Sequence, residues 1–372
     1  MIIMALDHVR EFMHNGTYSP DPTNLQTTTA FLFLTRWITH ICAPSFVFLA
    51  GTSAWLSFRK RNNPAETRKF LLTRGIVLIV LEITLINFAL WFDIRFRLIL
   101  LEVIAAIGFG LIILALMLRV PVYLTAVTGL LIILLHNLMP QSLTTEPAPG
   151  LIYSILFTPG LTQVSSGLSL YVAYPVMPWA GILLTGFATG RLFEIEPARR
   201  NRIFLITGIS LLILFTALRF LNGYGDPSVW TQQKTGFFTF LSFINTTKYP
   251  PSLLFTIFFT GLMFLVITAS GRINKRFRDT VSVFGRVPFF YFVIHLYLIH
   301  LAMFAILFLQ GFSTGDFQFG VFRNGRPDEV SGVSLGIIYI IWAGIVLLLY
   351  PVCRWYSRYK AEHSNIRILR YL

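Results

Sequence analysis

The sequence has little charge. Asp, Glu, Lys and Arg together make up only 12% of the 372 residues, whereas soluble globular domains carry about 25%. Hydrophobic residues account for 55% of the chain, and the mean hydropathy is +0.70. This composition excludes an ordinary soluble domain, because too few polar side chains are available to face water on all sides. It indicates a chain whose solvent is a lipid bilayer.

Cysteine is nearly absent too. Cys42 and Cys353 lie far apart, in or beside apolar segments, which argues against a disulfide framework and a thiolate metal site. The chain also lacks the GxxxxGK(S/T), GxGxxG and HExxH motifs, so nothing local supports nucleotide hydrolysis, dinucleotide binding or zincin chemistry. The seven histidines never occur at metal-ligand spacing. No bound metal is expected.

Basic residues are present in excess, with 30 Lys and Arg against 16 Asp and Glu and a net charge of +14. They are not spread over one soluble domain that could bind nucleic acid. They fall in short loops between apolar runs, which is the distribution that membrane topology produces. No nucleic-acid partner is expected.

Hydropathy predicts an all-α, polytopic membrane bundle of about ten transmembrane helices, formed by a single domain over residues 1–372. Each expected span approaches the length needed to cross a hydrocarbon core of about 30 Å. Residues 151–161 are too short and too broken by Pro and Gly, so they are expected to re-enter the membrane or lie at its surface. The expected spans lie near 1–14, 30–57, 70–92, 97–118, 121–138, 170–190, 202–220, 252–270, 286–310 and 334–353.

The loops alternate in charge. Segments 59–74, 191–202, 272–286 and the tail 354–372 carry most of the basic loop residues, while 139–170 carries none. Because cytoplasmic loops are enriched in Lys and Arg, the basic set is expected to be cytoplasmic. The tail is then cytoplasmic, and the long loops rich in Gly, Pro and Asn face outward.

The first span begins very close to the first residue. Only six residues precede Asp7, and the charged region and cleavage site of a signal peptide are both missing. The first helix is therefore expected to be N-terminally truncated, with about ten apolar residues and a basic flank missing upstream of it. A genuine half-span is the alternative.

Ionisable residues within apolar segments give the strongest functional signal, because charge is costly in hydrocarbon and usually faces a functional cavity. Four of them stand at i, i+3, i+4 and i+7 of the first helix: Asp7, Arg10, Glu11 and His14. This spacing places them on one helical face, where Asp7 or Glu11 is expected to orient His14 and raise its basicity. The alternative is an ion-paired helix end that reaches the headgroups.

The second span carries a matching pair. Arg36 and His40 are separated by four residues and share a face, in the outer half of the bilayer and level with the polar stripe of the first helix. Pro44 frees a backbone carbonyl, which a membrane tolerates only beside protein or water. The N-terminal segment 1–58 is therefore expected to carry the catalytic residues.

The order of two strings resembles a known family. MIIMALDHVREFMH (1–14) followed by FLTRWITHICAPSFVFLAGTSAWL (33–56) is similar to the catalytic region of the heparan-α-glucosaminide N-acetyltransferase family, in its bacterial branch. The resemblance continues in YPVMPWAGILLTGFATGRLF (174–193), NTTKYPPSLLFT (245–256) and FGRVPFFYFVIHLYLIH (284–300). It implies a membrane acyltransferase of the bacterial cytoplasmic (inner) membrane. Such an enzyme would take acetyl-CoA as co-substrate from the cytoplasm and acylate a sugar amine or hydroxyl at the outer face.

The general base is expected among three histidines. The resemblance places an asparagine of the lysosomal enzyme at the position of Asp7 and an aspartate at that of His40, so the residue pattern is not carried over unchanged. We favour His14, because it shares a face with Asp7 and lies at the outer end of the helix. His40 and His8 are the alternatives. Direct transfer and a histidine-bound acyl intermediate both stay open.

Further polar residues are expected to bind the acceptor or the acyl-CoA: Arg10, Arg36, Trp179, Lys248, Tyr249 and His295. Arg10 or Arg36 would stabilise the oxyanion of the transferred acyl group. Trp179 suits a sugar-stacking platform or, alternatively, a packing role. His295 lines the cavity or makes a buried structural hydrogen bond.

Two other functions compete with acyl transfer. A transporter or flippase for a glycan or lipid-linked substrate also places ionisable residues at membrane depth, but it often shows two related halves with matching broken helices. Here the polar residues concentrate in the first two spans. The third function is that of a non-catalytic membrane partner of an envelope enzyme. The expected partners are the bilayer and a sugar or glycan acceptor, and a homo-oligomer is compatible with this interpretation.

Overall fold

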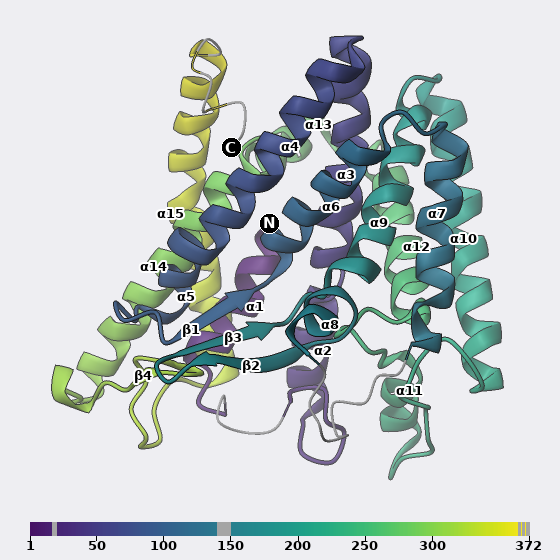
Figure 1. Cartoon of the computed structure of the whole chain (residues 1–372). Coiled ribbons are helices and arrows are strands. Elements are labelled where there is room, and N and C mark those ends of the chain that lie inside the picture. The colour runs from purple at the N-terminus through teal and green to yellow at the C-terminus, as the bar shows by residue number, and fades with distance from the viewer. Residues whose placement is uncertain (17–20, 140–149, 364–365, 367–368, 370–372) are drawn as a thin grey trace.

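The computed structural model describes residues 1–16, 21–139, 150–363, 366 and 369. Helices dominate, and they stand side by side as a bundle (Figure 1). In the described part of the chain, seven helical segments are long and apolar enough to cross a membrane. This confirms the prediction of a helical, multi-pass membrane protein.

The seven long segments correspond to seven of the ten expected spans. Three of them consist of consecutive helices, and four are single helices. The first group comprises α2 (Ala30–Thr39) with α3 (Cys42–Arg61), α4 (Pro64–Leu81) with a π-helical turn (Glu82–Ile86) and α5 (Asn87–Trp91), and α9 (Val176–Thr189) with a 3-10 turn (Gly190–Phe193). The second group comprises α10 (Pro197–Leu221), α12 (Leu253–Ser270), α14 (Pro288–Leu309) and α15 (Leu335–Glu362).

The other three expected spans are shorter helices. They are α1 (Ile2–Met13), α6 (Val103–Met117) and α7 (Val122–Leu135), the last extended by a 3-10 turn (His136–Leu138). With a rise of about 1.5 Å per residue, the 12 residues of α1 cover only about 18 Å. α1 is therefore shorter than a hydrocarbon core of about 30 Å, and it packs against α2, α14 and α15.

Two expected spans begin as strands, and here the sequence-based boundaries were wrong. Residues Leu98–Leu101 form β1 and residues Leu168–Val172 form β3, and the two pair in parallel from Leu98 opposite Ser169 to Leu101 opposite Val172. β2 (Gly160–Ser165) completes the sheet, antiparallel to β3. A four-residue apolar run has no period that separates a strand from the start of a helix, so hydropathy merged β1 with α6.

The bundle has two different ends (Figure 1). We call one the loop face: it carries the three-stranded sheet, α8 (Leu151–Leu156), α11 (Gly236–Ile244) and the 310–334 loop. That loop contains a 3-10 turn (Thr314–Asp316) and the strands β4 (Phe319–Gly320) and β5 (Arg323–Asn324). Residues 151–161 thus form a short helix and the beginning of a strand, and they do not span the bundle.

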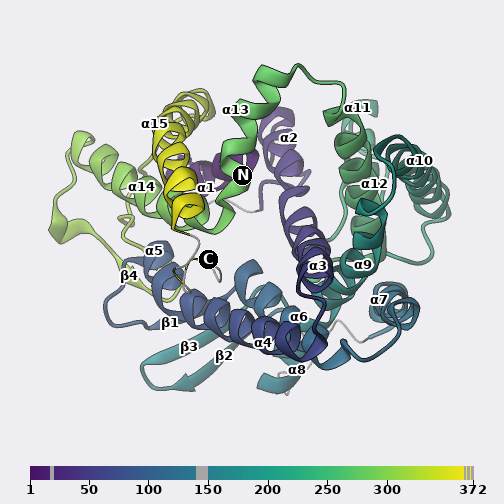
Figure 2. The same cartoon turned by 90° about the horizontal axis from the view of Figure 1, so that it is seen from above.

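The opposite end is the basic face. It holds the turn between α3 and α4, the start of α10, the C-terminal end of α15 and α13 (Lys275–Arg286), which crosses over this end of the bundle (Figure 2). α13 buries only Val283 and Phe284, and it leaves its charged residues exposed. The first residues of the expected tail 354–372 continue α15, and most of the tail after His363 lies outside the described residues.

Small residues bring the helices into close contact. At Gly51 of α3, an added Cβ would lie 2.0 Å from the backbone oxygen of Leu183 in α9, and at Gly186 of α9 it would lie 2.1 Å from that of Phe48. Only glycine permits this approach, which is the packing mode common between membrane helices. The contact fixes α3, and with it the residues at the α2–α3 junction.

Candidate active site between the first helices and the 245–252 loop

Two adjoining cavities lie on the loop-face side of the bundle. The outer chamber has a volume of about 480 Å³, and the inner chamber of about 70 Å³. Arg36, Lys248 and Tyr249 line both. The outer chamber is also lined by Asp21, Thr23, Asn24, His40, Ser228, Asn245, Thr246 and Thr247. The inner chamber is also lined by Met4, Asp7, His8, Glu11, Thr39, Cys42, Ala43, Phe46, Glu102, Val103, Tyr174 and Phe292.

A buried ion triad joins α1 to α2 beside these chambers. Arg10 donates from Nη2 to Oδ1 of Asp7 over 3.0 Å, and Arg36 donates from Nη1 to Oδ2 of the same carboxylate. Both oxygens of Asp7 are therefore engaged by guanidinium groups. The triad contains two cations and one anion, and of its three members Arg36 lines both chambers while Asp7 lines the inner one.

His40 lies at the junction of α2 and α3. Pro44 has no N–H with which to bond the carbonyl of His40, so the helix breaks there and restarts at Cys42. The His40 side chain is 4% exposed and packs against the rings of Phe255 and Phe259. Its Nδ1 has no hydrogen-bond partner in the described structure. His40 also lines the outer chamber, so its imidazole ring can meet a ligand there.

His8 lines the inner chamber and contacts a second histidine. Its ring stands edge-on to that of His295, with the centroids 5.1 Å apart. Nδ1 of His295 bonds the backbone oxygen of Tyr291 over 2.9 Å, while Nδ1 of His8 is buried without a partner in the described part of the chain. His295 thus lies behind His8 and outside the lining of both chambers. Glu11, one turn further along α1, faces the same chamber as His8.

His14 occupies a different position. It follows the last residue of α1 and pairs with Val333, its Nδ1 accepts the N–H of Gly16 over 3.1 Å, and its carbonyl oxygen accepts a hydrogen bond from Arg326. Partial burial, with Arg10 and Arg326 nearby, lowers the pKa of His14. His14 lines neither chamber, and no hydrogen bond joins it to Asp7 in the described structure. The expected stripe therefore divides, because the two arginines take the Asp7 carboxylate.

Lys248 and Tyr249 enter the site from the loop before α12. Asp226 holds this loop by accepting the N–H of Thr247 over 2.9 Å and the hydroxyl of Ser252 over 2.6 Å. Lys248 is only 8% exposed, and its Nζ lies 4.8 Å from the ring centroid of Tyr249. An ammonium group held at an aromatic face at the boundary of the two chambers is well placed to meet a developing negative charge.

Tyr174 and Trp179 form the wall behind this loop. The hydroxyls of Tyr174 and Tyr249 are 3.5 Å apart, and the Tyr174 ring packs on Trp179 with the centroids 4.7 Å apart. Burial, together with Tyr249, raises the pKa of Tyr174, so its phenol stays protonated at neutral pH. Trp179 is 0% exposed and lines neither chamber, so it occupies the packing position rather than that of a sugar platform.

Several residues in or beside the chamber lining are not among the site residues predicted from the sequence. Glu102 reaches the inner chamber, and its backbone N–H donates to the fully buried Glu82 over 2.8 Å. Glu82 begins the π-helical turn, a local irregularity that often accompanies functional sites. The signal was present, since both are carboxylates within apolar segments, but the sequence gives no partner for either. Tyr174 and Asn245 lie within strings that carry the family resemblance, yet nothing in their spacing singles them out.

No group of three or more His, Cys, Asp or Glu side chains within the described ranges is arranged to hold a metal ion.

Comparison with known protein families gives a match over the first part of the chain. Residues 1–224, more than half of the chain, match the family model described as heparan-alpha-glucosaminide N-acetyltransferase, catalytic. The matched region includes the ion triad, His8 and His40, and it ends before Lys248. No curated protein matches the sequence.

Proposed function

The chain belongs to the heparan-α-glucosaminide N-acetyltransferase family and is a membrane acetyltransferase, and on that premise we propose that it moves an acetyl group from acetyl-CoA to a sugar amine or hydroxyl through the two chambers. The observation that carries the proposal is the position of Arg36 and Lys248, which line both chambers at once. A donor carbonyl and an acceptor that meet at this boundary face two cations from different parts of the chain.

The outer chamber is suited to the acceptor. Its wall is rich in hydroxyl and amide side chains, such as Thr23, Asn24, Asn245 and Thr247, which both donate and accept hydrogen bonds. Its volume of about 480 Å³ lies within the range of small-molecule sites, about 300–1,000 Å³. This lining suits a hydroxylated ligand, as expected of a sugar or glycan.

The inner chamber is suited to the acyl thioester. Along α3, which runs toward the basic face, it is lined by Cys42, Ala43 and Phe46. An apolar wall of this kind accommodates an acetyl group and the thioester arm. The donor then approaches from the basic face and the acceptor from the loop face, so that the two meet at Arg36 and Lys248.

We propose His8 as the general base, in place of His14. His8 lines the inner chamber, whereas His14 lies outside both. The acceptor nitrogen or oxygen attacks the thioester carbonyl, its proton passes to the His8 imidazole, and the C–S bond breaks to release CoA thiolate, which takes up a proton. Arg36 and Lys248 stabilise the oxyanion of the tetrahedral intermediate, and Glu11 stabilises the imidazolium. No enzyme nucleophile is required, and His40 is the alternative base on the acceptor side.

The same proposal includes the sidedness. Under the positive-inside rule the basic face lies in the cytoplasm, so that the C-terminal tail is cytoplasmic and the acceptor side faces outward from a bacterial inner membrane. Residues 1–372 act as one domain, with the catalytic residues concentrated in 1–58. Assembly into a homo-oligomer is compatible with this arrangement.

The test is acetyl transfer in sealed proteoliposomes that contain the purified chain. Acetyl-CoA is added outside and a panel of amino and neutral sugars is enclosed, with vesicles lacking protein as the control. The proposal predicts free CoA thiol outside and acetylated sugar inside. Loss of unmodified sugar from the vesicles, without thioester cleavage by folded protein, would replace it with transport.

A further inference from the structure

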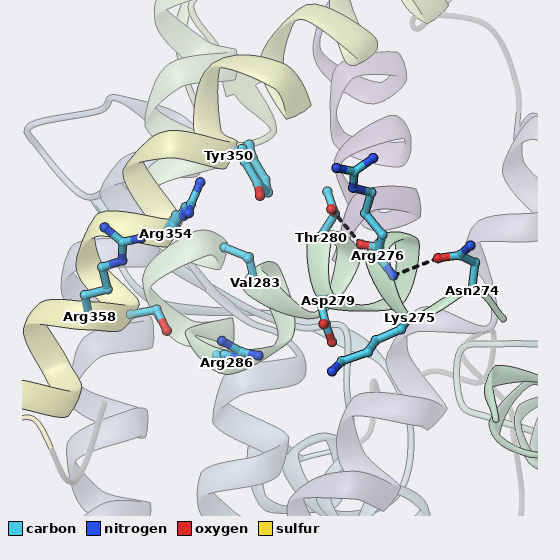
Figure 3. A pocket seen from close by; sticks show the side chains of 11 residues that line it. Asn274, Lys275, Arg276, Asp279, Thr280, Val283, Arg286, Tyr350, Arg354 and Arg358 are labelled. Atoms are coloured by element: carbon cyan, nitrogen blue, oxygen red, sulfur yellow. Dashed lines mark hydrogen bonds between the residues drawn. The ribbon is translucent and has the colours of Figure 1, made fainter.

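A third cavity lies at the opposite end of the molecule, between α13 and α15 (Figure 3). Its volume is about 790 Å³. We call it the basic pocket, and its lining residues are Asn274, Lys275, Arg276, Asp279, Thr280, Val283, Arg286, Tyr350, Arg354, Ser357 and Arg358. Figure 3 shows Tyr350 and Arg354 on one side of the pocket and Arg276 and Thr280 on the other, with Val283 between them.

The charge in this pocket is uncompensated. Five cationic side chains line it against a single carboxylate, that of Asp279. None of the five forms an ion pair within 4 Å in the parts of the chain that the structure describes. Arg354 and Arg358 also repel each other, since like charges four residues apart share a helical face. Such a cluster is stabilised when an anion occupies the space between its members.

The remaining lining residues favour a ligand larger than a single ion. The hydroxyls of Thr280 and Ser357 add hydrogen-bonding groups, and Tyr350 adds a half-buried aromatic ring. The first turn of α13, which contains Lys275 and Arg276, contributes the positive end of a helix dipole. Arginine also matches phosphate geometry with two parallel N–H donors.

Membrane topology alone does not account for the pocket. The positive-inside rule requires basic residues on this face, but it does not require two helices about 70 residues apart in sequence to converge around a cavity. The match to the acetyltransferase family ends at residue 224, so it assigns nothing to residues 274–358.

We propose that the basic pocket binds the phosphate groups of a polyanionic ligand. The source that its shape favours is the nucleotide end of acyl-CoA, which carries a diphosphate, a further ribose phosphate and an adenine ring for Tyr350. This assignment of the source rests on the proposed function. An anionic phospholipid headgroup offers the same phosphate chemistry and is distinguished by the test.

The first arm of the test uses adenosine 3′,5′-bisphosphate as the probe. Its binding to the full chain in nanodiscs of neutral phosphatidylcholine is measured by calorimetry. The pocket variant is Arg276→Gln with Arg354→Gln. The control is Arg278→Gln with Lys360→Gln, which removes the same charge from the same two helices at positions that do not line the pocket.

We expect saturable binding that the pocket variant weakens at least about tenfold, as for two solvent-exposed charge contacts, and that the control leaves unchanged. Equal weakening in both variants would reduce the effect to net charge and overturn the proposal. Thermal unfolding of both variants in nanodiscs shows whether each is folded.

The second arm separates the two sources of phosphate. If the nucleotide does not bind, retention of labelled phosphatidylglycerol is measured instead. Retention by the wild type and the control variant, together with its loss in the pocket variant, would assign the pocket to a lipid headgroup. If neither probe distinguishes the pocket variant from the control, the pocket binds no phosphate ligand and the proposal is wrong.

The pocket assignment and the proposed function can fail independently of each other. If the enzyme transfers acetyl groups and the pocket variant keeps the wild-type KM for acetyl-CoA, the nucleotide source is wrong and acetyl transfer stands. If the nucleotide binds in the pocket but no acceptor is acetylated, the pocket stands and the proposed function does not.

Discussion

Replacing Asp7 by alanine tests the ion triad, which is the structural basis of the site. Asp7 bonds both Arg10 and Arg36, and the side chains of Asp7 and Arg36 are only 11% and 15% exposed. The change therefore removes the carboxylate that both guanidinium groups bond, and it takes from the buried Arg36 the anion with which it forms its ion pair. Breaking a buried pair in this way costs about 3–5 kcal/mol of unfolding free energy. Screening by water takes little from this value, because all three groups are largely buried.

An exposed ion pair of the same chain provides the matched control. Arg323 and Asp328 form an ion pair with side chains 47% and 64% exposed, and pairs of this kind contribute about 0–1 kcal/mol. Asp328→Ala should therefore lower the free energy of unfolding by less than a third as much as Asp7→Ala. A second control, Asp7→Ala combined with Arg36→Met, should recover part of the loss, because it also removes the charge that has lost its anion.

The assay is reversible unfolding in mixed micelles, followed by the change in helical circular dichroism. Equal stability losses for Asp7→Ala and Asp328→Ala would refute the reasoning, since they would show that the triad is as well solvated as a surface pair. Failure of the Arg36→Met combination to recover stability would show that the loss at Asp7 comes from packing and not from unpaired charge.

Three further predictions concern packing, chemistry and the sheet. Gly51→Ala places a Cβ 2.0 Å from a backbone oxygen of α9, and it should lower the free energy of unfolding by about 1–3 kcal/mol or more in the same assay. In the control Gly336→Ala the added Cβ meets no atom within 4 Å, so the free energy of unfolding should stay unchanged. Lys248→Gln should lower kcat for acetyl transfer by about 10²–10³-fold if Lys248 meets the oxyanion, and the exposed Lys234→Gln should leave kcat unchanged; equal rates in both would exclude that role. Asn87→Ala removes the side chain that bonds the backbone of Leu98 and Leu100, over 3.0 Å each, and it should lower the free energy of unfolding by about 1–3 kcal/mol. Amide hydrogen exchange should become faster in β1 alone. Unchanged exchange in β1 would contradict the role of Asn87 in holding this strand.

The sequence predicts the class and most of the spans, because hydropathy is a local property of long segments. Its errors lie where the decisive contact is distant in the chain. β1 is a strand because Leu98–Leu101 pairs with Ser169–Val172, and nothing within the four-residue run announces that partner. The same holds for the basic pocket, where α13 and α15 converge without a shared motif.

The candidate site was predicted in part. Asp7 and Glu11 of the first helix lie around the same two adjoining chambers as the Arg36 and His40 pair, and Lys248 joins them from the loop before α12, whereas His14 lines neither chamber. Helical spacing alone gives Asp7 and His14 a common face, but it does not reveal that Arg10 and Arg36 occupy the Asp7 carboxylate. The choice between His8, His40 and His14 therefore depends on which side chain lines a chamber, and sequence spacing does not contain that information.

The most direct measurement of the central claim is single-turnover acetyl transfer by His8→Ala beside His14→Ala, at saturating acetyl-CoA and acceptor. With His8 as the general base in the inner chamber, His8→Ala should lower the rate of the chemical step by about 10²–10⁴-fold, while His14→Ala should stay close to wild type. A wild-type rate in His8→Ala together with the full loss in His14→Ala would contradict the account and move the site to the outer end of α1.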